Sequence, residues 1–108
     1  MDAHVLAEAR SLALHREVLA RIQHQPALLD RVRDRLRRWR EDPSKPQAYV
    51  IAWCELIDGP FEVLSSTMTS DDERAKSLRQ ATPFAGIVDA RTRWRIWAAV
   101  REQLLRSA

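Results

Sequence analysis

Along most of the chain, apolar residues recur three, four and seven positions apart, which is the spacing of one face of an α-helix. Two proline-containing stretches interrupt this pattern and are predicted to be loops, near residues 41–46 and 81–89. We therefore expect an all-α fold in which residues 1–108 form a single compact bundle of five or six helices. The expected helices span about 3–23, 26–40, 47–58, 60–66, 71–80 and 90–106.

Several residues at the ends of these segments suit helix caps. Asp2 and Asp89 can accept hydrogen bonds from the free N–H groups that begin the first and last helices. Ser70 and Glu73 have the spacing of a capping box at the start of the fifth helix. Gly59 follows the third helix and is predicted to end it in the left-handed conformation.

The first and third segments differ in how their apolar residues are distributed. The third, residues 47–58, is apolar around most of its circumference, so we expect it to be central and buried. In the first, Leu14 and Val18 lie off the main apolar stripe, and they either widen the buried face or form an exposed edge for a partner. The stripe predicted to face the core is Val5, Ala9, Leu12, Leu19 and Ile22.

The residues that turns require are scarce. The chain has two glycines and no asparagine, and its five prolines lie between the apolar-periodic segments, whereas strand-rich folds need frequent turns. The single cysteine, Cys54, has apolar neighbours and is interpreted as a small core residue. The sequence shows no signal-peptide pattern and no apolar run approaching the ~20 residues that span a bilayer. We therefore expect a cytoplasmic protein that binds no membrane.

Few side chains have the spacing of a catalytic or metal-binding site. His4, His15 and His24 have no Cys, Asp, Glu or second His at zinc-like spacing, and they are interpreted as surface or capping residues. No glycine-rich phosphate loop and no nucleophile elbow occurs. The sequence therefore favours a protein that binds another macromolecule, and we expect no enzymatic activity, no cofactor and no metal ion.

The formal net charge of +3 hides an uneven distribution of charge along the chain. Residues 47–73 hold six acids and no base, whereas residues 74–108 hold eight bases and two acids. Either these blocks form charged faces that contact a partner, or the acidic middle pairs with the basic ends once the chain folds.

The second helix carries a row of arginines. Arg31, Arg35 and Arg38 share one flank, so the helix sets three guanidiniums along a line that could follow nucleic-acid phosphates. Asp30 and Asp34 allow local ion pairs, which makes a solvated basic face the alternative interpretation. A narrow apolar seam on the same helix could instead pair with its copy in a homo-oligomer; this seam is Leu29, Val32 and Leu36.

The stretch 78–97 combines arginines with aromatic residues, which is the composition of interface hot spots. Pro83 and Gly86 set an unusual backbone path within it. The alternative is a structural clasp, in which Phe84 fills the core and the last helix closes over it. The residues predicted to contact a protein partner are Arg79, Phe84, Arg91, Arg93 and Trp94.

The same stretch resembles the C-terminal signature of a group of small helical bacterial proteins that look like antitoxins of type II toxin–antitoxin pairs. The residues that carry the likeness are Leu78-Arg79-Gln80, Pro83-Phe84-Ala85-Gly86-Ile87, Arg91 and Arg93-Trp94. Leu14-His15-Arg16 and Trp39 are similar as well, so the likeness covers most of the chain. The chain departs from the signature at Ala81 and Ala90, where a hydroxyl residue and a proline are expected.

This resemblance implies a function. Members of the group are encoded beside toxin genes, which implies a chain that neutralises a cognate protein toxin by direct binding and represses the shared promoter. An arginine of the docking surface could occupy an anionic active site, because a guanidinium pairs bidentately with carboxylates. A nucleic-acid-binding regulator that uses the second helix remains the alternative.

Overall fold

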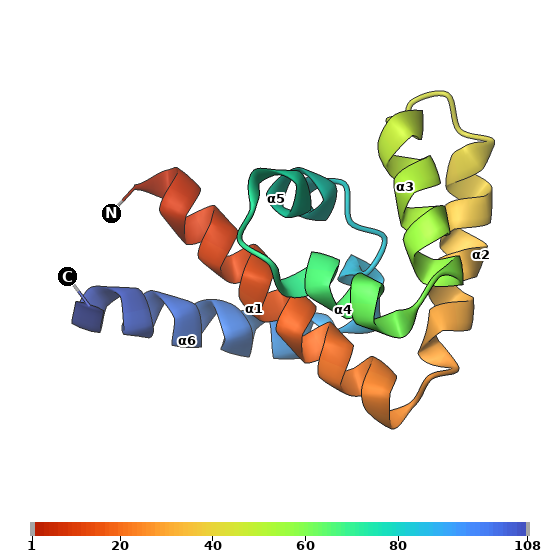
Figure 1. Cartoon of the computed structure of the whole chain (residues 1–108). Coiled ribbons are helices and arrows are strands. Elements are labelled where there is room, and N and C mark those ends of the chain that lie inside the picture. The colour runs from red at the N-terminus through yellow and green to blue at the C-terminus, as the bar shows by residue number, and fades with distance from the viewer. Residues whose placement is uncertain (1, 108) are drawn as a thin grey trace.

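The computed structural model describes residues 2–107, which form six α-helices and one short 3₁₀ turn and, within that range, no strand. The prediction of an all-α fold is confirmed, and each of the six expected segments is helical. The elements are α1 (Ala3–His24), α2 (Leu28–Arg40), α3 (Gln47–Asp58), α4 (Phe61–Thr69), α5 (Glu73–Gln80), η1 (Ala85–Ile87) and α6 (Ala90–Ser107) (Figure 1).

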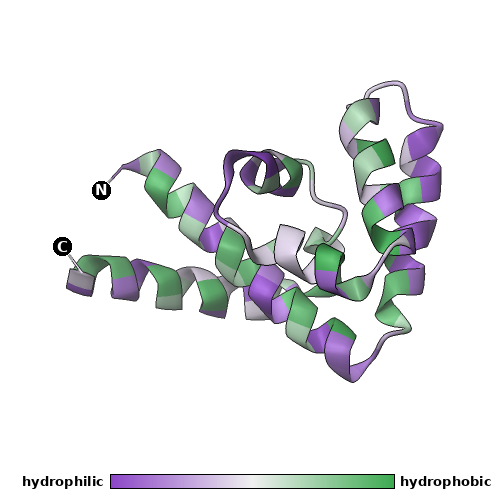
Figure 2. Cartoon of the chain, in the orientation of Figure 1, coloured by the Kyte–Doolittle hydropathy of each residue, from purple (hydrophilic) through white to green (hydrophobic). Residues whose placement is uncertain are grey.

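The helices form two pairs with a third layer between them. Figure 1 shows α1 and α6 crossing, and α2 and α3 paired at the opposite side of the molecule. Between the pairs, α4 contacts both α1 and α3, and α5 packs on α4 and α1. In Figure 2 hydrophobic and hydrophilic residues alternate along each long helix, as expected where one face is buried and the other is solvated.

The core is centred on Trp53 of α3. Its indole packs edge-to-face on the ring of Phe84, with the ring centroids 5.3 Å apart. The indole Nε1 donates a hydrogen bond to the carbonyl of Leu78 over 3.0 Å, so the buried N–H has a partner. The prediction that α3 is central and buried is confirmed for one face only: Val50, Trp53 and Ile57 are buried, whereas Ile51 is 40% exposed and the helix lies at the side of the molecule with α2. Aliphatic side chains complete the core, among them Val18, Ile22, Val32, Leu36, Val50, Leu64 and Met68.

The face that α1 turns to the core differs from the predicted stripe. Val5 belongs to that stripe but is 52% exposed, whereas Leu14 and Val18, which lie off it, are buried. A histidine occupies a core position on the buried face, and this hides the apolar period from a count of hydrophobic residues. The buried residues of α1 are Leu14, His15, Val18 and Ile22.

Two of the predicted N-terminal caps are confirmed and one is wrong. Asp2 and Asp89 each accept a backbone hydrogen bond of 2.7 Å, at the starts of α1 and α6. The cap of α5 is Asp72 rather than Ser70: the Asp72 carboxylate accepts from the N–H of Ala75 over 2.8 Å. Ser70 instead donates its hydroxyl to that carboxylate over 2.6 Å. Because α5 begins one residue after Asp72, the carboxylate is in the capping position.

Gly59 ends α3 in an extended conformation, with φ −92° and ψ −166°, so the predicted left-handed cap is wrong. Pro60 follows directly, and the residue before a proline is driven toward extended backbone by the proline ring. The chain then turns into α4, which continues past the predicted end at residue 66 as far as Thr69.

Candidate binding surface around the η1 turn

The structure places only part of the predicted partner surface on the outside of the molecule. Arg79 is 3% exposed and Phe84 is fully buried, so the prediction that these two residues contact a partner is wrong. Arg91 is exposed, Arg93 is half-buried and Trp94 is 72% exposed. The outward part of the predicted surface therefore lies on α6.

Arg79 binds the C-terminal end of α4. Its Nη1 donates to the carbonyls of Thr67, Met68 and Ser70, and the shortest of these bonds is 2.6 Å. Its Nη2 lies 3.9 Å from the carboxylate of Glu8 on α1. The last carbonyls of a helix have no partner within the helix, so a cationic donor placed there satisfies them and complements the helix dipole. This role explains why an arginine is buried.

Phe84 fills the core, as the structural-clasp interpretation expects. Its ring packs edge-to-face on Trp53 and on His15, with a centroid distance of 6.0 Å to the latter. Its backbone N–H donates to the hydroxyl oxygen of Thr82 over 3.1 Å. The η1 turn follows directly, so the buried ring fixes where that turn begins.

His15 joins α1 to the same connector, and its interpretation as a surface residue is wrong, because the side chain is fully buried. Its Nδ1 lies 2.7 Å from the carbonyl of Ser11, and its Nε2 lies 2.8 Å from the Thr82 hydroxyl. A neutral ring satisfies both contacts: Nδ1–H donates to the carbonyl and Nε2 accepts the hydroxyl proton. Burial is the main cause that lowers the pKa of His15 from 6.5 to about 4; the charge of Arg79 also lowers it, and the Ser11 hydrogen bond opposes the shift.

Acid is therefore expected to weaken the fold through His15. The unfolded chain binds a proton at this ring below pH 6.5, whereas the folded ring stays neutral down to about pH 4. The stabilisation from the neutral ring is complete above pH 6.5 and is lost as the pH falls to about 4, by about 3 kcal/mol in the free energy of unfolding. Urea denaturation at neutral pH and near pH 4 measures the loss. His15→Gln should flatten this slope and the exposed control His24→Gln should keep it; an unchanged slope in His15→Gln would contradict the assignment.

The η1 turn is held by arginines from two helices. Nη2 of Arg31 on α2 donates to the carbonyl of Gly86 over 3.1 Å. Nη2 of Arg93 on α6 donates to the carbonyl of Ala85 over 2.8 Å. The residues predicted for nucleic acid and those predicted for a protein partner therefore meet at one turn.

Gly86 allows the guanidinium of Arg35 to approach the backbone of the turn. A Cβ at position 86 would collide with Nη2 of Arg35 and would lie 3.2 Å from its Cζ. Gly86 has no positive φ, so the close approach explains this glycine, rather than its conformational freedom. On the same helix Arg33 and Arg37 pair with aspartates, whereas Arg35 has no hydrogen-bond or ion-pair partner among residues 2–107.

A cavity of about 240 Å³ lies between α2 and this connector. Its charged lining residues are Arg31, Arg35, Arg38 and Asp34. We call the three arginines the η1 arginine cluster. None of them forms an ion pair with a described acid. The one acid in the lining, Asp34, pairs with Arg37, 2.9 Å away. The three arginines thus line the α2 side of the cavity, opposite the turn, and binding of nucleic acid by them stays a prediction.

The outward face of α6 carries the most exposed of the large apolar side chains described. Arg91 and Trp94 are three residues apart on the helix and so lie on the same face. Trp97 is only half-exposed, and the guanidinium of Arg10 lies 5.7 Å from its ring centroid. The exposed residues of the outward face are Arg91, Trp94, Arg95, Ala98, Arg101, Glu102 and Leu105, and Glu102 pairs with Arg106.

Few ion pairs neutralise the acidic block of residues 47–73. Asp58 lies 3.7 Å from Arg33, and Glu73 lies 3.6 Å from Lys76 within the same helix. The remaining ion pairs found in residues 2–107 use acids outside this block. Pairing between the acidic middle and the basic ends therefore accounts for little of the charge, most of which is left to solvent or to a partner.

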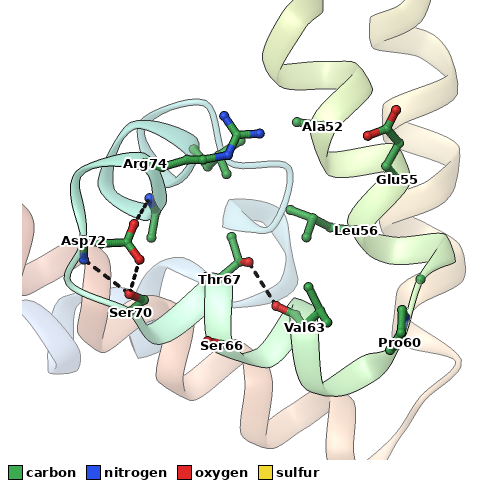
Figure 3. Close-up of a pocket in the computed structure, with 13 residues that line it drawn as sticks. Ala52, Glu55, Leu56, Pro60, Val63, Ser66, Thr67, Ser70, Asp72 and Arg74 are labelled. Carbon is green, nitrogen blue, oxygen red and sulfur yellow. Dashed lines mark hydrogen bonds between the residues drawn. The ribbon is translucent and has the colours of Figure 1, made fainter.

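A second cavity, of about 270 Å³, lies between α3, α4 and α5 (Figure 3). Leu56 points into it from α3, and Arg74 reaches across it from α5 toward Ala52. Thr67 on its wall donates its hydroxyl to the carbonyl of Val63 over 3.0 Å. The lining of this cavity is mixed polar and apolar, and it contains none of the predicted site residues.

The side chains, the helices and the comparisons with known proteins give no further assignment. Within residues 2–107 no three His, Cys, Asp or Glu side chains are close enough to hold a metal ion. None of the helices in that range is both long and apolar enough to cross a bilayer. No protein-family model matches the chain, and comparisons with curated proteins and with solved structures found no match. The resemblance seen in the C-terminal stretch therefore stays a prediction.

Proposed function

We propose that the chain is an antitoxin-like protein that neutralises a cognate protein toxin by binding it through the outward face of α6. The observation that supports this best is Trp94, a large ring that is 72% exposed beside Arg91. Tryptophan and arginine are the residues most enriched among those that dominate binding energy at interfaces. The family resemblance points to the same helix, because Arg91 and Arg93-Trp94 are part of its signature.

The exposure of Trp94 has no explanation within the monomer. Apolar surface in water is unfavourable by roughly 25 cal/mol per Å². The inner face of α6 contributes Ile96 and Trp97 to the packing against the core, and Val100 is buried, whereas Trp94 contributes nothing there. A partner that covers the ring would recover this free energy.

The chemistry of the face indicates an acidic partner surface. Arg91, Arg95 and Arg101 are exposed along α6, and none of them forms an ion pair within residues 2–107. Guanidiniums pair bidentately with carboxylates, so the fitting partner offers Asp or Glu side chains around an apolar pocket for Trp94. If that pocket is the toxin's anionic active site, docking would block it directly.

The experiment is capture of the protein encoded by the neighbouring gene. Trp94→Ala and Arg91→Glu are each expected to weaken capture about 30-fold, and to lose protection of cells against that protein, with the thermal midpoint of the chain unchanged. The controls are Arg74→Glu and Val63→Ala, which change exposed residues of the α3–α5 cavity and should bind as the parent does. Full capture by both α6 variants together with loss in the controls would overturn the proposal.

A nucleic-acid-binding regulator is the second candidate. It is favoured by one observation, the presence of Arg31, Arg35 and Arg38 around one cavity without acidic partners. Binding of promoter DNA would weaken steeply between low and moderate salt, because the released counterions drive it. A flat salt titration, or no shift of promoter DNA, would exclude this candidate.

A further inference from the structure

The guanidinium of Arg35 is positioned by the fold but has no partner in it. Gly86 gives it room against the backbone of the η1 turn, and no residue among 2–107 accepts a hydrogen bond from it. A guanidinium carries five N–H donors in a fixed plane. The fork is rigid, so less side-chain entropy is lost for each hydrogen bond that it forms with a ligand.

Two more arginines face the same space. Arg31 and Arg38 line the cavity with Arg35, from positions four residues before it and three residues after it on α2, so all three leave the helix on one flank. Arg31 uses one N–H on the η1 turn and keeps its others. The acid in the lining, Asp34, is engaged by Arg37. The cavity therefore concentrates positive charge without an internal counter-ion.

We propose that this cavity binds a phosphoryl group. Neighbouring cations repel one another, and an anion with several acceptor oxygens removes that repulsion while it accepts hydrogen bonds from all three guanidiniums. A phosphoryl group offers more acceptor directions and more charge than a carboxylate, and the planar fork of arginine matches it bidentately. Pro83 and Ile87 are buried and form the apolar part of the lining, opposite the arginines.

The shape of the cavity favours one phosphoryl group over a run of phosphates. The η1 turn closes the side opposite α2, and a volume of about 240 Å³ leaves room for the group and the first atoms attached to it. Inorganic phosphate and the terminal phosphate of a nucleotide or nucleic acid present the same oxygens. The inference stands apart from the proposed toxin partner, because the outward face of α6 contributes no residue to this lining.

Calorimetric titration with inorganic phosphate at low ionic strength tests the site. Arg35→Gln is expected to weaken binding at least about tenfold, because it removes the charged donors at the centre of the cavity. Gly86→Ala should weaken it by a similar factor, because the added Cβ displaces the Arg35 guanidinium while the net charge stays the same. The matched control is Arg40→Gln, which removes one charge from the same helix outside the cavity, leaves the Arg37–Asp34 pair intact and should bind as the parent does.

Several results would overturn the proposal. One is no phosphate binding by the parent, and another is equal weakening by Arg35→Gln and Arg40→Gln, which would indicate a general effect of net charge. The two perturbing variants act on Arg35 by different means, so one decides the question if the other fails to fold. Short oligonucleotides with and without a 5′-phosphate separate the sources: a preference for the phosphorylated end that Arg35→Gln abolishes supports the site. Equal, tighter binding of both oligonucleotides would assign the cluster to a nucleic-acid backbone instead.

Discussion

Replacing Arg79 with methionine is expected to lower the free energy of unfolding by about 3 kcal/mol. Methionine fills much of the volume, but it leaves the carbonyls of Thr67, Met68 and Ser70 without their cationic donor. Urea denaturation measures the loss. The matched control is Arg101→Met on the exposed side of α6, which should change stability by no more than about 0.5 kcal/mol.

Lysine at position 79 is expected to restore only part of this stability. It keeps the positive charge, but one ammonium lacks the planar fork that reaches the carbonyls and Glu8 together. An Arg79→Met variant that was as stable as the parent, and defective only in partner capture, would show that the side chain leaves its buried site to bind. The structural role described for Arg79 would then be wrong.

Replacing Phe84 with alanine is expected to cost about 3–5 kcal/mol of the free energy of unfolding. The ring is fully buried and packs on Trp53, so its loss leaves a cavity at the centre of the core. The matched control is Phe61→Ala at the start of α4, where the ring is 37% exposed, and a loss below about 1 kcal/mol is expected. Thermal and urea unfolding of both variants make the comparison.

The Phe84 variant also separates a structural role from a binding role. If the ring only anchors the connector, Phe84→Leu should recover most of the stability and the phosphate affinity together, because leucine refills the space and the η1 turn returns to its place. Equal stability losses in Phe84→Ala and Phe61→Ala would contradict the central position assigned to Phe84.

The helices could be predicted from the sequence because their apolar spacing is local information. The bounds of α3 agree with the predicted 47–58, since Pro46 and Gly59 mark its two ends. The conformation of Gly59 differs from the predicted left-handed cap because the ring of the following Pro60 favours extended backbone at the residue before it.

The buried polar residues were missed because charge normally marks the surface. A signal for Arg79 was nevertheless present: it lies four residues after Ala75 and directly after Leu78, and both of these apolar residues are buried. His15 likewise lies between Leu14 and Val18 on the face that the core uses. The helical period, applied without regard to polarity, would have placed both side chains inside.

The row of arginines in the candidate site could be predicted from helical spacing, but its meeting with the η1 turn could not, because those contacts join distant parts of the chain. The hydrogen bond between Arg31 and Gly86 links α2 to a turn that is 55 residues away in sequence. One indication was available, namely that Gly86 is one of only two glycines in the chain. A residue without a side chain is expected where another group approaches the backbone closely, but the sequence does not say which group that is.

The η1 turn offers two neighbouring peptide oxygens, and each is bound by an arginine from a different helix. Since α2 and α6 make little direct contact and α1 packs against both, these oxygens add a second link between the two helices. An anion that drew Arg31 away would break its hydrogen bond to the carbonyl of Gly86. The neighbouring carbonyl, that of Ala85, binds Arg93 and so positions the first turns of α6. A small ligand beside α2 and a macromolecular ligand on α6 would then be allosterically coupled. Each would change the affinity of the chain for the other by the same factor.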